Sequence, residues 1–416
     1  MLFTSKLGFL GSLLLFLPTA FAGFSSSSTT NLAVYWGQNS YGQGTGSLAQ
    51  QRLSYYCANT QFNIIPLAFL ITLGNPSLNF ANAGDNCTAI SGSNLFYCAQ
   101  LEADIGTCQT TYGKTILLSV GGATYTEGGF STSAAAISAA TNIWKIFGPL
   151  IDTTVPRPFG NAVVDGFDFD FEATVSNMAP FANQLRNLMT TSTATTGKEY
   201  LLTAAPQCPY PDAADDQMLA GAVPFDAIWV QFYNNYCGLQ SFTVGSSTQN
   251  NFNFATWDNW AKTVSLNPNV KVFLGIPGNT GAGAGYQSGS TLASIISYSK
   301  GFSSFGGVMI WDMSQVYANS GFLSSVVSDL GQPATTTISA TLTTSTLSST
   351  TILSSSTVTP TTLQTVTTTT TSAGSTPTTP LVNQWNQCAG EGWTGGTVCA
   401  PPYVCTYLSV WYSQCE

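Results

Sequence analysis

The sequence predicts a (β/α)8 TIM barrel, an α/β fold, followed by a linker and a small disulfide-stapled β module. Three observations lead to this prediction. Eight short runs rich in β-branched and aromatic residues recur between residues 32 and 312, and most are separated by 25 or more residues. Such spacing leaves room for a crossover helix between successive strands. A Ser/Thr-rich stretch then separates this body from a last segment that carries four cysteines.

The expected strands lie at 32–36, 62–70, 115–122, 166–172, 200–206, 227–233, 270–276 and 306–312. Helix-compatible segments lie between them, at 134–147, 178–190 and 291–300. Eight parallel strands with crossover helices, in a body of this length, indicate a closed barrel. An open doubly wound sheet is the alternative, but no Gly-rich dinucleotide fingerprint follows the first strand.

The first 22 residues have the features of a signal peptide. Lys6 precedes an apolar run over 7–16, and Ala20-Phe21-Ala22 has the small-x-small pattern of a cleavage site. A membrane anchor is the alternative, but the run is too short to span a bilayer. We therefore expect a secreted, extracellular protein that is not membrane-bound, with association to a cell wall left open.

Composition narrows the possible partners and chemistry. A net charge of −9 with only ten Lys and Arg disfavours nucleic acid or an anionic membrane as partner, so a neutral ligand fits better. The chain has no histidine and no CxxC pair, which excludes zinc fingers, His-bearing metal sites and Ser-His or Cys-His nucleophiles. We expect a monomer without metal or cofactor, whose catalysis, if any, uses carboxylates, Tyr, Lys, Ser or Cys.

These features divide the chain into four parts, the first of which is the expected signal peptide at 1–22. The expected barrel covers 24–332 and is the candidate catalytic domain, 333–381 is a Ser/Thr-rich stretch typical of an O-glycosylated linker, and 382–416 is the terminal module. The ten cysteines fall into a group of six in the barrel and a group of four in the terminal module, which suggests disulfides within each group. Asn86 lies in the one N-glycosylation sequon that we identify, although Cys87 in its middle position leaves open whether it is modified.

The stretch DGFDFDFE, residues 165–172, holds four of the 19 acidic residues. Side chains alternate along a strand, so Asp168, Asp170 and Glu172 share one face and the intervening phenylalanines the other. In a barrel the acids face the interior and the phenylalanines face the helices. Asp165 is out of phase, and we expect it to tie down the turn before the strand.

Crowded, buried carboxyls cannot all ionise, and one of them can stay protonated near neutral pH. Glu172 lies at the carboxyl end of its strand, where barrel enzymes keep their active sites, so it is the candidate general acid. Asp170 is positioned to share its proton, and Asp168 to hold Asp170. The alternative is a purely structural cluster of buried acids.

A glycosidase ordinarily needs two carboxylates that face each other across the sugar. Asp170 and Glu172 come from one strand, with α-carbons about 6.6 Å apart. The other strand ends carry no acid, apart from Asp312 beside Trp311, of which only one can point inward, while Glu127 and Asp212 fall in loops. The nucleophile can therefore belong to the substrate, as an N-acetyl group at C2 of the sugar.

Five further motifs accompany the acidic stretch, namely YWGQN (35–39), SVGG (119–122), TAAPQCPYPD (203–212), QFYNN (231–235) and GGVMIW (306–311). In this order, and over nearly all of 31–330, they resemble glycoside hydrolase family 18, specifically the chitinases of plant class III and their fungal relatives. The resemblance implies catalysis by Glu172 as proton donor, with Asp170 and Asp168 behind it and Tyr233 and Asp170 binding the acetamido group of the substrate.

The same resemblance assigns further roles. Gln231 would lie beside Tyr233, Trp311 would be the platform under the sugar, and Tyr35 and Gln38 would line the cleft, although each aromatic residue could instead serve packing. It also implies three disulfides, Cys57–Cys108, Cys87–Cys98 and Cys208–Cys237. The sequence departs from the family pattern with phenylalanine where aliphatic residues are usual at 167 and 171, on the outward face.

The tail has more aromatic residues than so small an interior can hold, so some should be exposed. Its sequence resembles the fungal family 1 carbohydrate-binding module over its whole length, which implies a binding face of Trp385, Trp411, Tyr412 and Gln414. The implied disulfides are Cys388–Cys405 and Cys399–Cys415. Ser409 stands where the family often has Asn. An aromatic mini-core is the alternative, and chitin and cellulose both remain possible ligands.

These expectations combine into one function. The resemblance implies a secreted endo-chitinase that hydrolyses β-1,4 linkages between N-acetylglucosamine units with retention, through an oxazolinium intermediate, while the tail holds it on an insoluble polysaccharide. The alternatives are an endo-β-N-acetylglucosaminidase acting on N-glycans and a catalytically inactive chitin-binding lectin.

Overall fold

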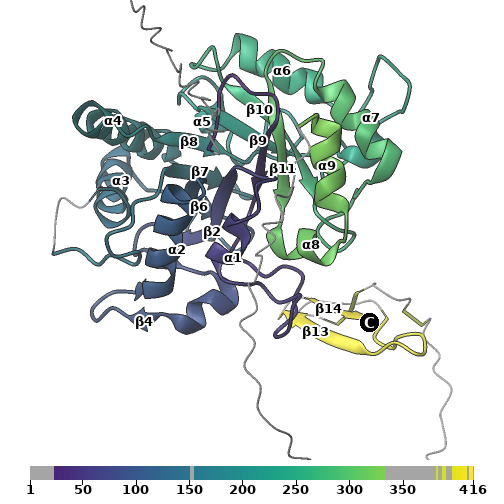
Figure 1. Ribbon diagram of the computed structural model, residues 1–416, viewed down its shortest axis with the longest axis horizontal. Helices are drawn as coiled ribbons and strands as arrows, with labels where there is room; N and C mark the ends of the chain where they lie inside the picture. The colour runs from purple at the N-terminus through teal and green to yellow at the C-terminus, as the bar shows by residue number, and fades with distance from the viewer. Residues whose placement is uncertain are drawn as a thin grey trace, which may run out of the picture. The chain divides into compact units, whose positions relative to one another are not determined.

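The computed structural model describes residues 23–149, 154–332, 381–382, 387–389, 396–409 and 412–415. The chain divides into two compact units, residues 1–339 and 340–416. Figure 1 shows the first unit as a group of strands surrounded by helices, and the second as a small sheet. Within the described residues, no helix is long and apolar enough to cross a membrane.

Eight parallel strands of the first unit close into a barrel. They pair in the order β1-β11-β10-β9-β8-β7-β6-β2, and β2 pairs in turn with β1. The barrel strands are β1 (Asn31–Val34), β2 (Ile64–Thr72), β6 (Thr115–Gly121), β7 (Gly166–Asp170), β8 (Leu201–Ala204), β9 (Ala227–Gln231), β10 (Lys271–Pro277) and β11 (Phe305–Trp311). Each overlaps one of the eight predicted runs, so the predicted barrel is confirmed.

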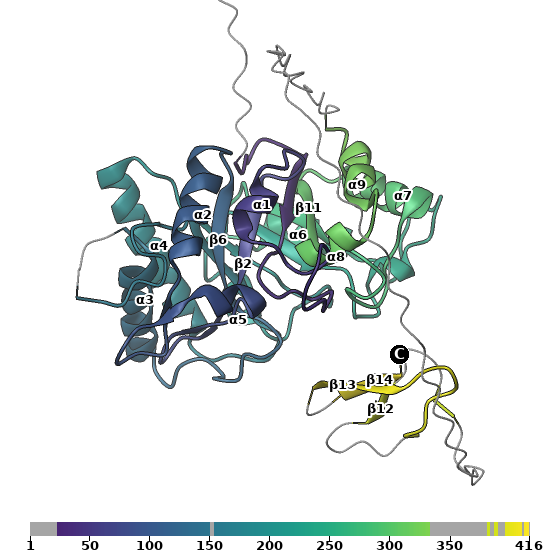
Figure 2. The ribbon, with the colours of Figure 1, turned by 60° about the horizontal axis from the view of Figure 1, so that its bottom comes forward.

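Helices connect the strands and cover the barrel from outside (Figures 1 and 2). They are α1 (Leu53–Cys57), α2 (Ala99–Thr110), α3 (Ser133–Phe147), α4 (Met178–Thr196), α5 (Asp216–Leu219), α6 (Phe254–Thr263), α7 (Gly289–Ser299), α8 (Met313–Ala318) and α9 (Phe322–Leu330), with short 3-10 helices at Ala81–Asn86 and Leu239–Ser241. The three predicted helical segments fall in α3, α4 and α7.

Additional strands extend the barrel on one side. β3 (Ser77–Leu78) pairs antiparallel with β2, and β4 (Thr88–Ala89) with β5 (Phe96–Tyr97), all within the long connection between β2 and α2. A disulfide between Cys87 and Cys98 closes this excursion.

The hydrophobic core has two layers. The larger one fills the space between strands and helices, and its members lie on the outward faces of the strands. The smaller one lies inside the barrel and consists mainly of Ala33, Tyr35, Ile64, Ala68, Phe69, Leu117, Ala205, Ala227, Trp229, Tyr233, Phe273 and Met309. Along the strands these inner positions generally alternate with outer ones, because neighbouring side chains of a strand point to opposite faces. β2 departs from this pattern, since Ala68 and Phe69 are adjacent and the register with β6 shifts between Ala68 and Leu70. A side chain's parity in its strand therefore decides whether it reaches the inside of the barrel.

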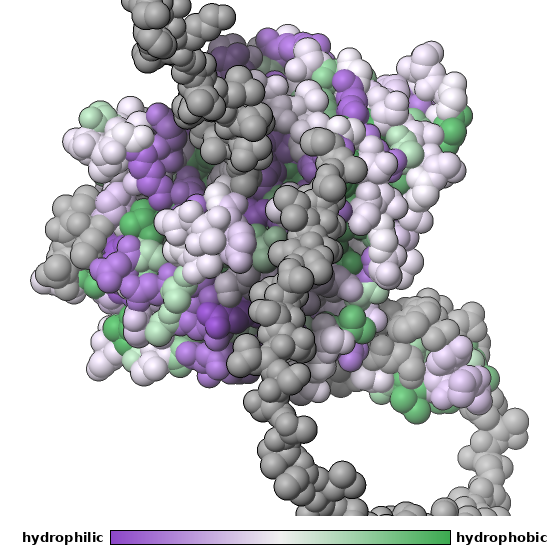
Figure 3. All heavy atoms as spheres, in the orientation of Figure 1, coloured by the Kyte–Doolittle hydropathy of each residue, from purple (hydrophilic) through white to green (hydrophobic). Residues whose placement is uncertain are grey.

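The surface of the first unit is weakly polar. In Figure 3 the visible face is largely pale or purple, with green residues scattered singly. This pattern follows from a composition with only 7% charged residues, in which small residues near zero hydropathy must cover much of the surface.

The second unit contains a three-stranded antiparallel sheet in the order β12-β14-β13. Its strands are β12 (Gln387–Ala389), β13 (Cys405–Ser409) and β14 (Tyr412–Cys415). Disulfides Cys388–Cys405 and Cys399–Cys415 join the sheet. Together with Cys57–Cys108, Cys87–Cys98 and Cys208–Cys237 in the first unit, these are the pairs that the two family resemblances imply.

Candidate active site

Strand β7 turns its phenylalanines outward and its aspartates into the barrel. Its phenylalanines are fully buried in the outer core layer, where Phe169 lies 6.0 Å from Phe181 of α4 between ring centroids. Burying one such side chain contributes about 1.5–3 kcal/mol. Asp168 and Asp170 occupy the opposite face and are both buried. The predicted alternation is confirmed, and the outward phenylalanines fix which way the acids point.

Asp168 is held by four neutral donors at the centre of the barrel. Its Oδ2 accepts hydrogen bonds from the hydroxyls of Tyr35 (2.5 Å) and Ser119 (2.6 Å), and its Oδ1 from Thr203 Oγ1 (2.7 Å) and Trp229 Nε1 (2.6 Å). Burial raises the pKa of Asp168, although these four hydrogen bonds act to lower it. The four donors come from four different strands or strand ends, so Asp168 connects these strands inside the barrel. Because all its acceptor directions are used, Asp168 is not free to bind substrate.

Asp170 lies next along the same face. Its Oδ1 accepts a hydrogen bond from Gln231 Nε2 (2.8 Å), which also donates to the carbonyl oxygen of Ala205 (2.8 Å). Burial and the neighbouring charges of Glu172 and Asp168 raise the pKa of Asp170 well above its ordinary value. Asp170 therefore interacts with both neighbouring acids through charge, and a proton shared between Asp170 and Glu172 stays a prediction.

Glu172 lies two residues beyond the end of β7 and lines a cavity of about 290 Å³. The lining residues are Ala123, Asp170, Glu172, Gln207, Gln231, Tyr233, Asn234, Asn235, Ala282 and Trp311. The side chain of Glu172 is exposed to this cavity, yet the surrounding walls partly desolvate its carboxyl and raise the pKa of Glu172. A carboxyl in this setting can keep its proton at a pH where an ordinary glutamate has lost it.

The cavity walls are otherwise uncharged. Asn235 Nδ2 donates to Gln207 Oε1 (3.0 Å), and the Asn234 carboxamide oxygen accepts from the backbone N–H of Ala284 (2.7 Å). Burial and the charge of Asp170 raise the pKa of Tyr233 well above its ordinary value, so its hydroxyl stays protonated. Amides and one phenol are groups that bind hydroxyls and amides of a neutral ligand.

Glycines of the SVGG motif bring the end of β6 close to the acidic strand. A Cβ on Gly121 would lie 2.4 Å from the Asp170 carbonyl oxygen, and its φ of +114° is one that other residues rarely adopt. The N–H of Gly122 then donates to the same carbonyl (2.7 Å). Gly121 is therefore required sterically, since a larger residue would push β6 away from the strand that carries Asp170.

Trp311 and Asp312 at the end of β11 point in opposite directions, as predicted. The Trp311 ring lines the cavity, whereas Asp312 is buried and caps α8 by accepting the N–H of Gln315 (3.1 Å) and the hydroxyl of Ser314 (2.7 Å). Asp312 is thus occupied structurally. The Trp311 ring packs against the Tyr35 ring in a tilted arrangement, with ring centroids 5.5 Å apart.

Tyr35 and Gln38 do not line the cavity, in contrast to their expected place in the cleft. Tyr35 is only 1% exposed because its parity on the first strand directs it into the barrel, where its hydroxyl meets Asp168. Gln38 Nε2 donates to the carbonyl oxygens of Ala68 in β2 (2.9 Å) and of Asn79 just after β3 (3.0 Å), so its amide connects the loop after β1 to these two segments.

Asp165 and Glu127 are structural acids outside the cavity. The Asp165 carboxylate accepts the N–H of Ile116 (2.8 Å) and forms an ion pair with Lys198 (2.8 Å), as expected for a residue that ties down the start of β7. Glu127 accepts the backbone N–H of Leu73 (2.5 Å) and so connects the loop after β6 to the end of β2.

The loop after β8 contains two buried acids whose importance the sequence did not reveal. Asp212 accepts the N–H groups of Gln207 (3.0 Å), Ala214 (2.9 Å) and Asp215 (2.7 Å) and thereby shapes the loop. Asp215 is fully buried, and neither of its carboxyl oxygens has a hydrogen-bond partner within the described part of the chain. Burial and the charges of Asp212 and Asp170 raise the pKa of Asp215 well above its ordinary value.

Asp215→Asn should make folding stability less dependent on pH. Because the pKa of Asp215 is raised on folding, the folded state holds the proton more tightly, and stability is lost as pH rises from the unfolded pKa towards the folded one. Each unit of this shift is worth about 1.4 kcal/mol. The free energy of unfolding, measured with denaturant at pH 4 and at pH 7, should therefore fall less between the two pH values for the variant than for the wild type. Asp216→Asn, at an exposed neighbouring position, is the control. The prediction is contradicted if the change in unfolding free energy between pH 4 and pH 7 is the same in Asp215→Asn as in the wild type.

The cavity thus presents two carboxyls, Asp170 and Glu172, from a single wall, and within the described residues no other carboxyl lines it. Residues 31–289 match the family model described as glycosyl hydrolases family 18. The chain belongs to glycosyl hydrolase family 18. The matched span contains the whole acidic strand and most of the cavity, while β11 with Trp311 lies beyond it.

Two relatives and one solved structure each match about three quarters of this chain. Endochitinase 33 of Trichoderma harzianum is 55% identical over 323 residues, which are 77% of this chain and 98% of the relative. The class III chitinase of Arthroderma benhamiae is 50% identical over 74% of this chain and 88% of its own length. A solved structure of a xylanase and alpha-amylase inhibitor protein from Scadoxus multiflorus has a TM-score of 0.57 and 30% identity, covering 72% of this chain and 98% of the other.

Residues 384–412 match the model of the fungal cellulose binding domain. Trp385 and Trp411, two of the four residues predicted for the binding face, lie outside the described residues. Tyr412 and Gln414 lie on β14, and their side chains are also outside what the structure describes.

Proposed function

We propose that this family 18 protein is a secreted endo-chitinase that cleaves β-1,4 linkages between N-acetylglucosamine units with retention. One observation carries the proposal. The two carboxyls of the cavity, Asp170 and Glu172, come from the same strand end and approach a ligand from one side. A double-displacement mechanism with an enzyme nucleophile needs a carboxylate across the sugar ring, so the attacking group is assigned to the substrate.

In the proposed reaction Glu172 donates its proton to the glycosidic oxygen as the bond to the anomeric carbon breaks. The acetamido oxygen of the same sugar attacks that carbon and gives an oxazolinium ion. Asp170 stabilises the positive charge on the acetamido nitrogen, and Tyr233 hydrogen-bonds the acetamido oxygen and fixes its direction of attack. The Glu172 carboxylate then removes a proton from water, which opens the ring from the side of the departed group and restores the original configuration.

Binding in the cavity follows from the same residues. Gln231 orients Asp170 through the hydrogen bond of 2.8 Å, and the Trp311 ring supplies a flat apolar surface for the face of the sugar. The Tyr35 ring contacts the Trp311 ring at 5.5 Å between centroids. Tyr35 therefore supports the Trp311 ring and does not itself contact the sugar.

The tail and the leader complete the proposal. Residues 382–416 hold the enzyme on insoluble chitin or cellulose, 333–381 act as a glycosylated tether, and 1–22 direct secretion. Two features favour an oxidising, extracellular setting, namely the five disulfides and Asn86, whose exposed side chain in the sequon is accessible to glycosylation.

Product analysis tests the proposed function. The full chain is incubated with colloidal chitin and, separately, with a high-mannose glycoprotein, and the released sugars are identified by mass and by anomer. Soluble chito-oligosaccharides that appear first as the β-anomer support the proposal. Release of an N-glycan with no attack on chitin would replace it by an endo-β-N-acetylglucosaminidase. Tight binding of chitin without turnover would indicate a lectin.

A further inference from the structure

Two exposed tyrosines flank the disulfide Cys208–Cys237 beside the cavity. Tyr236 is 64% exposed and Tyr210 is 40% exposed. The disulfide joins the loop after β8 to the loop after β9, with 5.9 Å between the α-carbons of its cysteines. We call these two tyrosines, Tyr210 and Tyr236, the cystine rim.

The same two loops supply the amides of the cavity wall. Gln207, immediately before Cys208, and Asn235, immediately before Tyr236, both line the cavity and are hydrogen-bonded to each other at 3.0 Å. The rim is therefore continuous along the chain with the wall of the site. Its tyrosines lie only one and three residues from a lining amide.

The Tyr236 loop is held from several sides. Asn234 makes two hydrogen bonds with Ala284. Its backbone N–H donates to the Ala284 carbonyl oxygen at 2.9 Å, and its side-chain Oδ1 accepts the N–H of Ala284 at 2.7 Å. The Asn235 carbonyl oxygen accepts from Gln240 Nε2 at 2.6 Å, and Cys237 is fixed by the disulfide. A ring presented on such a loop loses little conformational freedom when it binds, which favours affinity.

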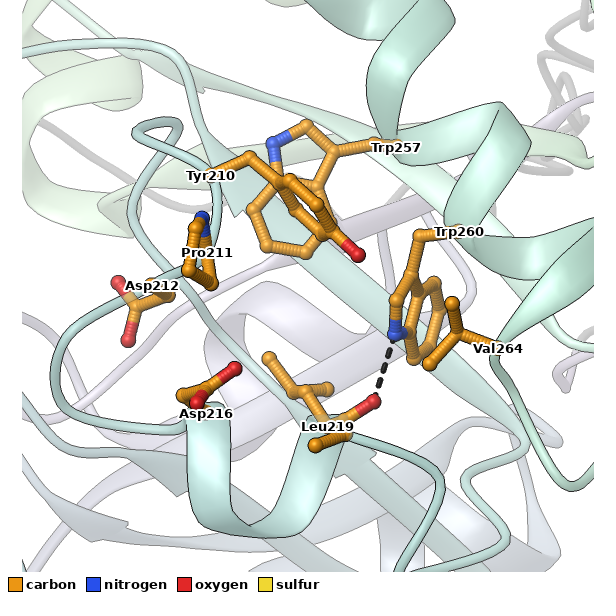
Figure 4. A pocket seen from close by; sticks show the side chains of 9 residues that line it. Tyr210, Pro211, Asp212, Asp216, Leu219, Trp257, Trp260 and Val264 are labelled. Atoms are coloured by element: carbon orange, nitrogen blue, oxygen red, sulfur yellow. Dashed lines mark hydrogen bonds between the residues drawn. The ribbon is translucent and has the colours of Figure 1, made fainter.

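Tyr236 and Tyr210 differ in their contacts with other aromatic rings. Across the described residues of the first unit, no aromatic ring lies against it, whereas Tyr210 meets Trp257 edge-on at 5.2 Å. Figure 4 shows the Tyr210 ring at the edge of a small cavity of about 130 Å³ that Trp257 and Trp260 also line. Tyr210 is thus anchored on one side and exposed on the other, while the Tyr236 ring is offered to solvent.

We propose that the cystine rim binds sugar rings of the chitin chain outside the cavity, with Tyr236 as the principal stacking residue. This inference rests on the proposed function. A cavity of about 290 Å³ is at the lower end of small-molecule sites, which begin near ~300 Å³, so most of a polymeric substrate lies beyond it. Apolar C–H faces of N-acetylglucosamine match an exposed, uncharged aromatic ring. The rim thereby favours long chains over short oligosaccharides.

Tyr236→Ala tests this role by comparing two substrates. Chitohexaose extends past the cavity, whereas a fluorogenic chitobioside is too short to span cavity and rim together. For the full chain, KM for chitohexaose should rise about 3- to 10-fold, the range expected for loss of one aromatic contact, while kcat/KM for the chitobioside changes less than about twofold. Tyr236→Phe keeps the ring and should restore the KM for chitohexaose.

Leu266→Ala provides the matched control. Leu266 is 56% exposed and lies between α6 and β10, at the opposite end of the barrel, so both substrates should be unaffected. If Tyr236→Ala reduces kcat/KM equally for both substrates, or for neither, the proposal that the cystine rim binds sugar is overturned. If the wild type hydrolyses neither substrate, the proposed function has failed instead. In that case chitohexaose binding to Glu172→Gln and to Glu172→Gln/Tyr236→Ala still decides whether the rim binds sugar, because the second should bind about 3- to 10-fold more weakly.

Discussion

Glu172→Gln should lower kcat on chito-oligosaccharides by about 10²- to 10⁴-fold, the usual contribution of a general acid. The amide matches the glutamate in size and still accepts hydrogen bonds, but it has no acidic proton to give to the leaving oxygen. Substrate binding should be retained, because Trp311, Gln231 and Tyr233 are untouched. Steady-state kinetics and direct titration of the variant with chitohexaose measure the two effects separately.

Glu199→Gln is the control for this substitution, since Glu199 is an exposed glutamate shortly before β8, at the other end of the barrel. It should keep wild-type activity. A Glu172→Gln variant that retains a tenth of the activity would contradict the assignment of Glu172 as proton donor. Loss of binding together with activity would point instead to a folding or subsite defect.

Asp168→Ala should cost about 3–5 kcal/mol of folding stability. The substitution removes a fully buried acceptor and leaves the donors of Tyr35, Ser119, Thr203 and Trp229 without partners in the middle of the barrel. Unsatisfied buried polar groups and the new cavity act in the same direction. Denaturant unfolding monitored by tryptophan fluorescence measures the loss.

Asp168→Asn distinguishes hydrogen bonding from charge. The carbonyl oxygen of the new asparagine can accept from Thr203 and from Trp229, whose indole N–H can only donate. The NH2 group of the asparagine can donate to the hydroxyl oxygens of Tyr35 and Ser119 once these hydroxyl groups rotate. Most of the stability lost in Asp168→Ala should therefore return. If Asn and Ala destabilise equally, the negative charge of Asp168 and not its set of hydrogen bonds maintains the barrel.

The sequence alone was sufficient to predict the fold, because each strand is indicated by a pattern of neighbouring residues. The eight strands were predicted from runs of β-branched and aromatic residues, and each corresponds to a barrel strand. The direction of Asp168 and Asp170 also followed from strand alternation, since Phe169 between them needs a hydrophobic partner and α4 provides it. The placement of Glu172 at a strand end followed in the same way, as did the opposite directions of Trp311 and Asp312.

Contacts between distant segments were not predictable from these patterns. Tyr35 was expected in the cleft, but its hydroxyl meets Asp168, 133 positions away in the sequence. Asp212 was assigned to a loop, and no role was predicted for Asp215. Both are buried, and both interact electrostatically with Asp170. No local signal distinguishes a loop acid that folds inward from one that stays in water.

The sequence by itself determined the positions of the strands, the face of β7 that carries the acids and the absence of histidine chemistry, because side-chain periodicity and composition are properties of neighbouring residues. The tertiary structure decided which groups surround those acids, which of them are desolvated and which aromatic residues remain exposed beside the cavity. Burial and long-range hydrogen bonding depend on segments far apart in the chain, and they set the protonation and orientation on which the proposed reaction depends.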